Sequence, residues 1–128
     1  MKHGILVTHG EIGRALIDAA ERIVGKQEFL QTLSVQKLSV KDIYERLKAM
    51  VSGPAKEDDV IIMASLRGGS CWNVSVAVAK EFPRIKVVSG VNLPMVLSFL
   101  TKREHFNGEE LVEILHQDAI RGVAVNED

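Results

Sequence analysis

The sequence predicts an α/β fold in which an open, mainly parallel sheet carries helices on both faces. Three observations support this prediction. Short aliphatic runs suited to buried strands recur at residues 5–7, 60–64 and 85–91. Stretches with apolar residues at helical spacing separate these runs, and a glycine-containing turn lies at the end of each one. Strands that alternate with helices in this way form right-handed βαβ units, which build parallel sheets.

The chain opens with a strand, a tight turn and a helix. Residues 5–7 form the strand, and Thr8-His9-Gly10 form the turn, where Gly10 supplies conformational freedom. The helix is expected to end near Gly25, because glycine is a common residue just past a helix end. Its inward face is predicted from apolar residues at helical spacing, which are Ile12, Leu16, Ala19, Ala20 and Ile23.

The rest of the chain continues this alternation within one expected domain, residues 1–128. Ser39 and Asp42 resemble a capping box at a helix start, and Pro83 is expected to stop another helix. The remaining expected elements are a strand at 29–35, a helix at 39–53, a strand at 60–64, a helix at 73–82, a strand at 85–91, a helix from 94, a helix at 107–122 and a short C-terminal edge strand at 123–125.

Composition excludes several classes of protein. Of the 128 residues, 46% are hydrophobic and 26% are charged, as in soluble globular proteins. The net charge of −1, with both signs interspersed, argues against binding to nucleic acid. No apolar run approaches the ~20 residues that span a bilayer, and the N-terminus lacks a secretory signal. A single cysteine, Cys71, cannot form an internal disulfide, which is typical of the cytoplasm.

The expected strand order, 2-1-3-4, brings two loops together. In open α/β sheets, ligands bind where the carboxyl ends of strands meet at a switch in strand order. Here that arrangement puts His9 opposite the Gly68-Gly69-Ser70 loop, which opens a helix. An imidazole can attack phosphorus, and a helix N-terminus lined by small residues favours an anion such as phosphate. Each feature alone also fits an ordinary structural role, as a solvated histidine or a helix cap.

Three motifs together resemble one known family. They are Leu6-Val7-Thr8-His9-Gly10, Gly68-Gly69-Ser70-Cys71-Trp72-Asn73 and Ser89-Gly90-Val91-Asn92-Leu93-Pro94-Met95. In this order and spacing they look like the enzyme IIA domain of the mannose family of the phosphoenolpyruvate-dependent sugar phosphotransferase system. The resemblance covers essentially the whole chain and implies a flavodoxin-like open sheet.

The resemblance implies a phosphoryl carrier, formally a phosphotransferase, with no cofactor and no metal. His9 would accept a phosphoryl group from the phosphocarrier HPr and pass it to a IIB component that serves a membrane sugar permease, for sugar uptake or regulation. It also implies a cytoplasmic protein that is often a homodimer, with the last strand packed on the partner. The residues expected to bind phosphate or to line the site are Thr8, Gly10, Ser65, Arg67, Gly68, Gly69, Ser70 and Asn92.

The chain departs from the family pattern at three positions. Ser65 stands where the family has an aspartate thought to orient the histidine; a hydroxyl can accept the ring N–H but carries no charge. Cys71 stands where proline is usual, and a half-buried inert thiol is expected there. Arg67 stands where an aromatic residue is common, and it could clamp phosphate or be solvated.

Two other functions fit parts of the pattern. Thr8-His9-Gly10-Glu11 is similar to the opening of the histidine phosphatases and mutases. Thr8 replaces their arginine, however, and those enzymes need further arginines and a second histidine. The other alternative is a regulatory module that keeps the phosphohistidine as a signal without a sugar permease, which the departure at Ser65 makes credible. No pair of histidines has the spacing of metal ligands.

Overall fold

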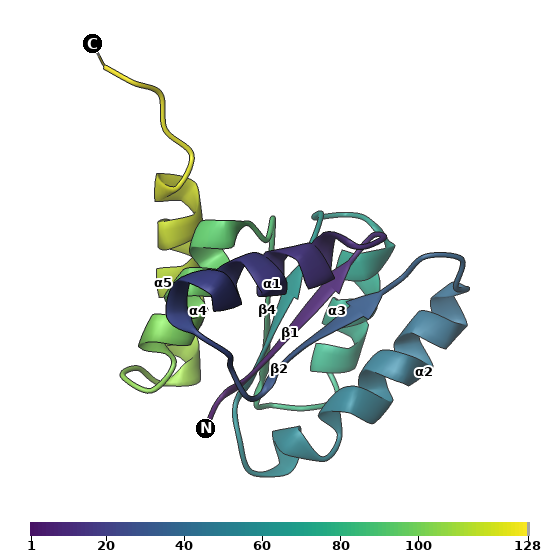
Figure 1. Ribbon diagram of the computed structural model, residues 1–128. Helices are drawn as coiled ribbons and strands as arrows, with labels where there is room; N and C mark the ends of the chain where they lie inside the picture. Colours follow the sequence, from purple (N-terminus) through teal and green to yellow (C-terminus); the bar gives the residue numbers. More distant parts are fainter. Residues whose placement is uncertain (128) are drawn as a thin grey trace.

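Four parallel strands form the centre of the structure. The computed structural model describes residues 1–127. Its strands are β1 (His3–Thr8), β2 (Leu30–Ser34), β3 (Val60–Ala64) and β4 (Ile85–Ser89). They lie in the order β2-β1-β3-β4 (Figure 1), which confirms the predicted order. The register pairs Val7 with Ala64 and Ala64 with Ser89, so the carboxyl ends of the strands form one edge of the sheet.

Helices cover both faces of this sheet, as the alternating pattern predicts. They are α1 (Ile12–Val24), α2 (Val40–Val51), α3 (Ser70–Ala79), α4 (Leu93–Lys102) and α5 (Gly108–Arg121), with a short 3-10 helix at Pro54–Lys56. The buried residues of α2 and α3 pack on one face, and those of α1, α4 and α5 pack on the other (Figure 1). None of the helices within residues 1–127 is long and apolar enough to cross a membrane.

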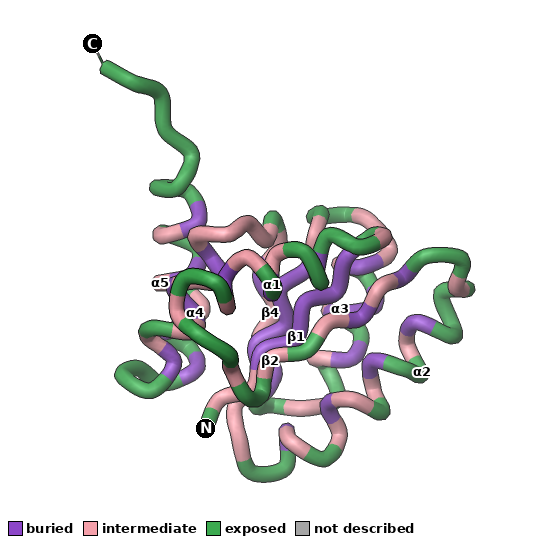
Figure 2. Tube along the Cα trace, viewed as in Figure 1, coloured by how far each residue is buried: buried purple, intermediate pink, exposed green. Residues whose placement is uncertain are grey.

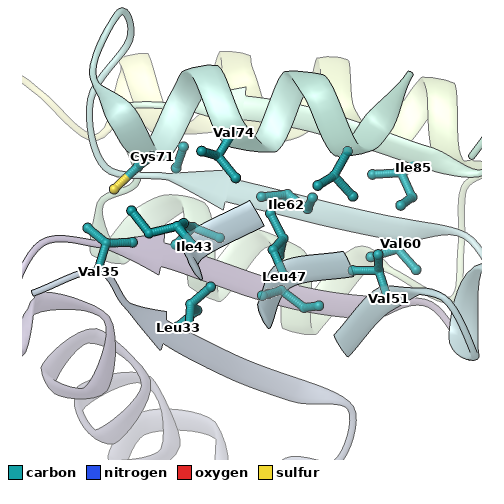
Figure 3. Close-up of a cluster of buried hydrophobic side chains, with 14 of the residues drawn as sticks. Leu33, Val35, Ile43, Leu47, Val51, Val60, Ile62, Cys71, Val74 and Ile85 are labelled. Carbon is teal, nitrogen blue, oxygen red and sulfur yellow. The ribbon is translucent and has the colours of Figure 1, made fainter. Parts of the chain in front are cut away.

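The two central strands account for the aliphatic runs in the sequence. All five residues of β3 are buried, and successive side chains point to opposite faces, so that Ile62 joins the core under α2 and α3 while Ile61 joins the other core. The buried centre and the exposed outer surfaces of the helices are visible in Figure 2. Figure 3 shows the first core, with Cys71 at the start of α3 at one end of it.

The capping signal at Ser39 is confirmed in part, and a second helix start has a complete capping box. The hydroxyl of Ser39 accepts a hydrogen bond of 3.1 Å from the backbone N–H of Asp42, at the start of α2. At the start of α5, Asn107 and Glu110 form a reciprocal capping box. Both arrangements satisfy N–H groups that have no partner within the helix.

The predicted inward face of α1 is partly wrong. Ile12 and Ile23 are 51% and 62% exposed. Of the predicted residues, Ala20 is buried and Leu16 packs against the core, while Gly13 and Ile17 are buried without having been predicted. The predicted and observed faces thus overlap and differ by a rotation about the helix axis. The close approach of α1 to the sheet at Gly13 selects the observed face, because any larger residue at that position would collide with β1 and β2.

The predicted bounds of three other elements shift by a few residues. α3 begins at Ser70 instead of Asn73 and ends at Ala79, because Gly69 serves as the extended residue before its first turn and Pro83 follows closely. β2 begins only at Leu30, since Phe29 has a φ of 57°. β4 ends at Ser89, since Gly90 has a φ of 75°. A left-handed backbone cannot continue a strand.

The predicted C-terminal edge strand is not formed in this chain. Residues 123–125 have no regular secondary structure, and Val123 and Val125 are 78% and 84% exposed. Figure 1 shows this end of the chain leaving α5 and running away from the sheet. Three residues form too few ladder hydrogen bonds to hold a strand on an edge without further packing.

Candidate functional site

His9 lies in the turn at the carboxyl end of β1. The next residue, Gly10, has a φ of 53°, a left-handed conformation that glycine adopts readily. The hydroxyl of Ser34, at the end of β2, donates a hydrogen bond of 2.7 Å to the carbonyl of Gly10. This contact holds the turn beside the neighbouring strand. The His9 side chain itself is exposed.

Thr8 supports this turn from inside the protein. Its side chain is fully buried, and its hydroxyl accepts a hydrogen bond of 2.9 Å from the backbone N–H of Gly13. A Cβ at Gly13 would come within 2.8 Å of that hydroxyl, so the first turn of α1 is packed tightly on the strand end. Thr8, which the sequence includes in the site, therefore fixes the position of His9 from behind.

Ser65 brings the end of β3 to the imidazole, as the predicted topology requires. Its backbone N–H donates a hydrogen bond of 3.0 Å to the carbonyl of Val7, which extends the pairing of the two central strands. Its hydroxyl oxygen lies 2.9 Å from Nδ1 of His9. When Nδ1 carries the proton, it donates to this oxygen, and Nε2 then keeps a free lone pair.

The glycine loop lies next to the same ring. Gly68 has a φ of 84°, and Gly69 is the extended residue that precedes α3. A Cβ built on Gly69 would lie 4.0 Å from Cε1 of His9, so the backbone of the loop passes close to the imidazole. The first turn of α3 starts at Ser70 and contains no acidic residue. Its N–H groups and the helix dipole favour a negative charge near His9.

Cys71 is a neighbour of His9 that the sequence does not assign to the site. Its side chain is fully buried, and its Sγ lies 3.8 Å from Nδ1 and 4.0 Å from Nε2 of the imidazole. Burial raises the pKa of the Cys71 thiol, an effect that a hydrogen bond with Ser65 partly offsets. A signal for this contact was available. The buried residues of α3, which are 71, 74, 75 and 78, follow helical spacing, so residue 71 points inward at the end of the helix nearest the strand ends.

Two predicted site residues lie around a different hollow. Asn92 caps α4 through a hydrogen bond of 3.0 Å from the N–H of Met95, and its amide donates to the carbonyl of Ala119 at 3.0 Å. Arg67 is exposed. Both line a cavity of about 590 Å³ along β4, together with Trp72 and His116. The structure thus groups Ser65 and the glycine loop around His9, while Arg67 and Asn92 border this cavity.

The other three histidines lie at other places. His3 is at the amino end of β1, where its Nε2 is 3.4 Å from a carboxylate oxygen of Asp58. His105 follows α4, and His116 is on α5. Within residues 1–127 no group of three or more histidine, cysteine, aspartate or glutamate side chains could hold a metal ion. A phosphatase or mutase would need a second histidine beside His9. Within residues 1–127, the ring nitrogens of His9 contact Ser65 and Cys71 and no second histidine.

Comparisons with known protein families give one match over most of the chain. Residues 4–116 match the family model described as the PTS system fructose IIA component. This range includes the turn of His9, the Ser65 position, the glycine loop and all of the four strands except the first residue of β1. The family model therefore covers every part of the candidate site.

Individual relatives agree with this match. The chain is 29% identical over 115 residues to the PTS system sorbose-specific EIIA component of Klebsiella pneumoniae, covering 90% of this chain and 84% of that protein. It is 25% identical to the mannose-specific EIIAB component of Escherichia coli K12, of which it spans 38%. The crystal structure of an EIIA component from Streptococcus agalactiae superposes with a TM-score of 0.90 at 27% identity, covering 98% and 97% of the two chains.

Proposed function

The chain belongs to the mannose, fructose and sorbose family of IIA components of the sugar phosphotransferase system, and we propose that it carries the phosphoryl group on His9. The observation that carries this proposal is the contact of 2.9 Å between Ser65 Oγ and Nδ1 of His9, on an exposed side chain. One ring nitrogen is occupied by the protein, and the other is left for the incoming phosphorus.

The proposed step is an in-line displacement at phosphorus. The Nε2 lone pair of His9 forms a new N–P bond while the N–P bond of the donor phosphohistidine breaks, and the electron pair of that bond returns to the donor ring. Positive charge develops on the His9 ring as the bond forms. The hydrogen bond from Nδ1–H to the hydroxyl of Ser65 stabilises that charge and fixes the plane of the ring.

The first turn of α3 is the proposed binding site for the phosphoryl oxygens. Gly68 and Gly69 keep side chains away from the approach to His9, and Ser70 contributes a hydroxyl and a backbone N–H at the helix start. Three equatorial oxygens carry negative charge during transfer, and donors already in place stabilise them without reorganisation. Arg67 is exposed in the same loop and adds a positive charge to it, although its side chain borders the cavity along β4.

The proposed partners are HPr, as phosphoryl donor, and a IIB component, as acceptor. An acceptor that exchanges its phosphoryl group with two other proteins needs a reactive nitrogen at the surface, and the exposed His9 meets this need. The exchange with HPr implies a cytoplasmic protein, which the IIB partner would bring into peripheral association with a membrane permease. We also propose that residues 1–128 form a single domain.

A homodimer is the proposed assembly. β4 is an edge strand of the sheet, and an unpaired strand edge readily binds another strand. The cavity beside it is lined by Val87 and Val88 of β4 and by Val123, at the start of the exposed C-terminal segment. In the proposed dimer, residues 123–125 of one copy pair with β4 of the other. A chain truncated after Gly122 should sediment as a monomer where the full chain sediments as a dimer; a dimeric truncated chain would refute this pairing.

The experiment that tests the carrier function is phosphorylation of the full chain with phosphoenolpyruvate, enzyme I and HPr. Mass spectrometry under alkaline conditions preserves an acid-labile phosphohistidine and locates it. The wild type should gain one phosphoryl group on His9, His9→Ala should gain none, and the control His116→Ala should be labelled like the wild type. Label on another histidine, or label that persists in His9→Ala, would overturn the proposal.

The departure at Ser65 favours a second candidate, a regulatory phosphohistidine module. A hydroxyl stabilises the positive charge of the ring less than a carboxylate does, so the energetics of phosphoryl transfer differ from those of the family pattern, which is compatible with a signalling role. Addition of IIB components of this family to the labelled protein separates the two candidates. Loss of label to IIB supports the transport function, whereas label retained with every IIB component supports the regulatory one.

A further inference from the structure

We propose that Cys71 is a positioning residue for His9, with its sulfur forming the surface on which the imidazole rests. This inference rests on the proposed function of His9. The sulfur lies 3.8 and 4.0 Å from the two ring nitrogens. Because these distances are nearly equal, the sulfur is not directed at one N–H group and contacts both nitrogens of the ring.

The need for such a residue follows from the exposure of His9. A histidine in a surface turn can populate several side-chain rotamers, and a single hydrogen bond at Nδ1 still allows the ring to swing about that contact. Ser65 supplies the single hydrogen bond. Contact with a second, fixed group restricts the ring to one orientation and so fixes the direction of Nε2.

The backbone that carries Cys71 is well placed to provide a fixed surface. Residue 71 belongs to the first turn of α3, where the N–H of Asn73 donates to the carbonyl of Gly69 at 2.9 Å. The buried hydroxyl of Ser75 donates to the carbonyl of Cys71 at 2.6 Å. The side chain of Cys71 also belongs to the core between the sheet and α3 (Figure 3). The sulfur is thus anchored by a helix, while the imidazole comes from a turn.

The charge state of the thiol suits this role. Burial raises the pKa of Cys71, so the group remains a neutral thiol at neutral pH. A thiolate beside an imidazole would form an ion pair with the protonated ring and would repel an anionic phosphoryl donor. A neutral sulfur supports the ring by dispersion contacts and leaves the Nε2 lone pair available.

The test compares Cys71→Ala with Cys71→Ser in the full chain. Two quantities are measured: the initial rate of phosphoryl uptake from HPr, and the tautomer and line widths of the His9 ring by long-range proton–nitrogen NMR. Cys71→Ala removes the contact and should lower the rate about tenfold, since small misplacements of a reacting group have effects of this size or larger. Its ring signals should show mixed tautomers. Cys71→Ser keeps a polar atom of similar position and should stay within about threefold of the wild type.

A matched control separates positioning from general stability. Val78 is fully buried on the same helix, at the end far from His9. Val78→Ala should lower the unfolding temperature without changing the His9 ring signals or the phosphorylation rate. Wild-type rate and wild-type ring signals in Cys71→Ala would overturn the proposal. If Cys71→Ala does not fold, the test rests on Cys71→Ser. A folded serine variant with a large loss of rate but unchanged ring signals would refute the positioning role of Cys71.

The two readouts also separate this inference from the carrier function. The NMR signals report on the ring whether or not it is phosphorylated. If the wild type were not labelled on His9, the carrier function would fail, while a changed tautomer in Cys71→Ala would still support the contact. If labelling occurs on His9 but the alanine variant matches the wild type in both measurements, only the role of Cys71 fails.

Discussion

The hydroxyl oxygen of Ser65 lies 2.9 Å from Nδ1 of His9, and this contact joins the ends of two adjacent parallel strands that are 56 residues apart in sequence. One group is a neutral hydroxyl, so this contact orients the imidazole through a group that carries no charge. Two other features of the fold hold this pair in place. They are the buried hydroxyl of Thr8 beneath the turn and the start of α3 beside the ring.

The Thr8 hydroxyl should be essential for the stability of the turn. Thr8→Val keeps the shape of the side chain but leaves the N–H of Gly13 without its buried partner. An unsatisfied buried donor costs about 1–3 kcal/mol, so chemical denaturation should show a loss of this size in the free energy of unfolding. Thr8→Ser, which keeps the acceptor, is the control. Equal stability of the valine variant and the wild type would contradict the prediction.

The sequence predicts much of this site because topology depends on patterns that are local. The aliphatic runs at residues 5–7 and 60–64 identify the central strands, and the 2-1-3-4 order then places His9 beside the loop that starts at Ser65. Neither step requires knowledge of side-chain contacts. The same local logic explains why Ser39 caps the start of α2 and why α5 starts at the predicted position.

The features that the sequence does not predict all depend on tertiary packing. Two sets of apolar residues in α1 have the same period, and only the fit of Gly13 against Thr8 and Thr32 decides which one faces the sheet. The contact of Cys71 with His9 depends on where α3 starts and on its rotation, which differ from the expected start at Asn73. The short apolar run at 123–125 predicts a strand only if a sheet edge is available, in the same chain or in a partner, and within one chain these residues have no strand beside them.

The glycine loop should affect phosphorylation without changing which residue is labelled. Ser70→Ala removes one donor at the proposed phosphate site, a change of about 1–3 kcal/mol, which corresponds to roughly 5- to 150-fold in rate. Gly68→Val places a branched side chain at a φ of 84°, which strains the loop that flanks His9. Initial rates of phosphoryl transfer from HPr measure both effects. Wild-type rates in both variants would show that the loop acts only as a turn.

The Cys71 thiol should make the stability of the protein depend on pH at alkaline values. Burial raises its pKa in the folded state above that of the unfolded chain. A group whose pKa is higher in the folded state than in the unfolded state stabilises the fold at pH values below its pKa in the unfolded state. This stabilisation is lost as the pH rises through its pKa in the folded state. The free energy of unfolding should therefore fall more steeply above the ordinary thiol range in the wild type than in Cys71→Ser. Parallel curves for the two proteins would contradict this prediction.

Residue 65 offers the most direct test of how His9 is controlled. Ser65→Asp places a carboxylate where the hydroxyl now lies 2.9 Å from Nδ1, and a nearby negative charge favours the protonated ring. The protonated ring has no lone pair for phosphorus, so its persistence to higher pH should slow phosphoryl uptake at acidic pH. At alkaline pH both proteins have the neutral ring, and the difference in rate should shrink.

Ser65→Ala is the matched control, because it removes the hydrogen bond without adding charge and should slow uptake at all pH values. The His9 ring protons, followed by NMR titration, give the second readout, and their midpoint should move to higher pH only in the aspartate variant. An unchanged midpoint in Ser65→Asp would show that residue 65 does not face the imidazole in solution, and the orientation of the ring by this residue would then have to be abandoned.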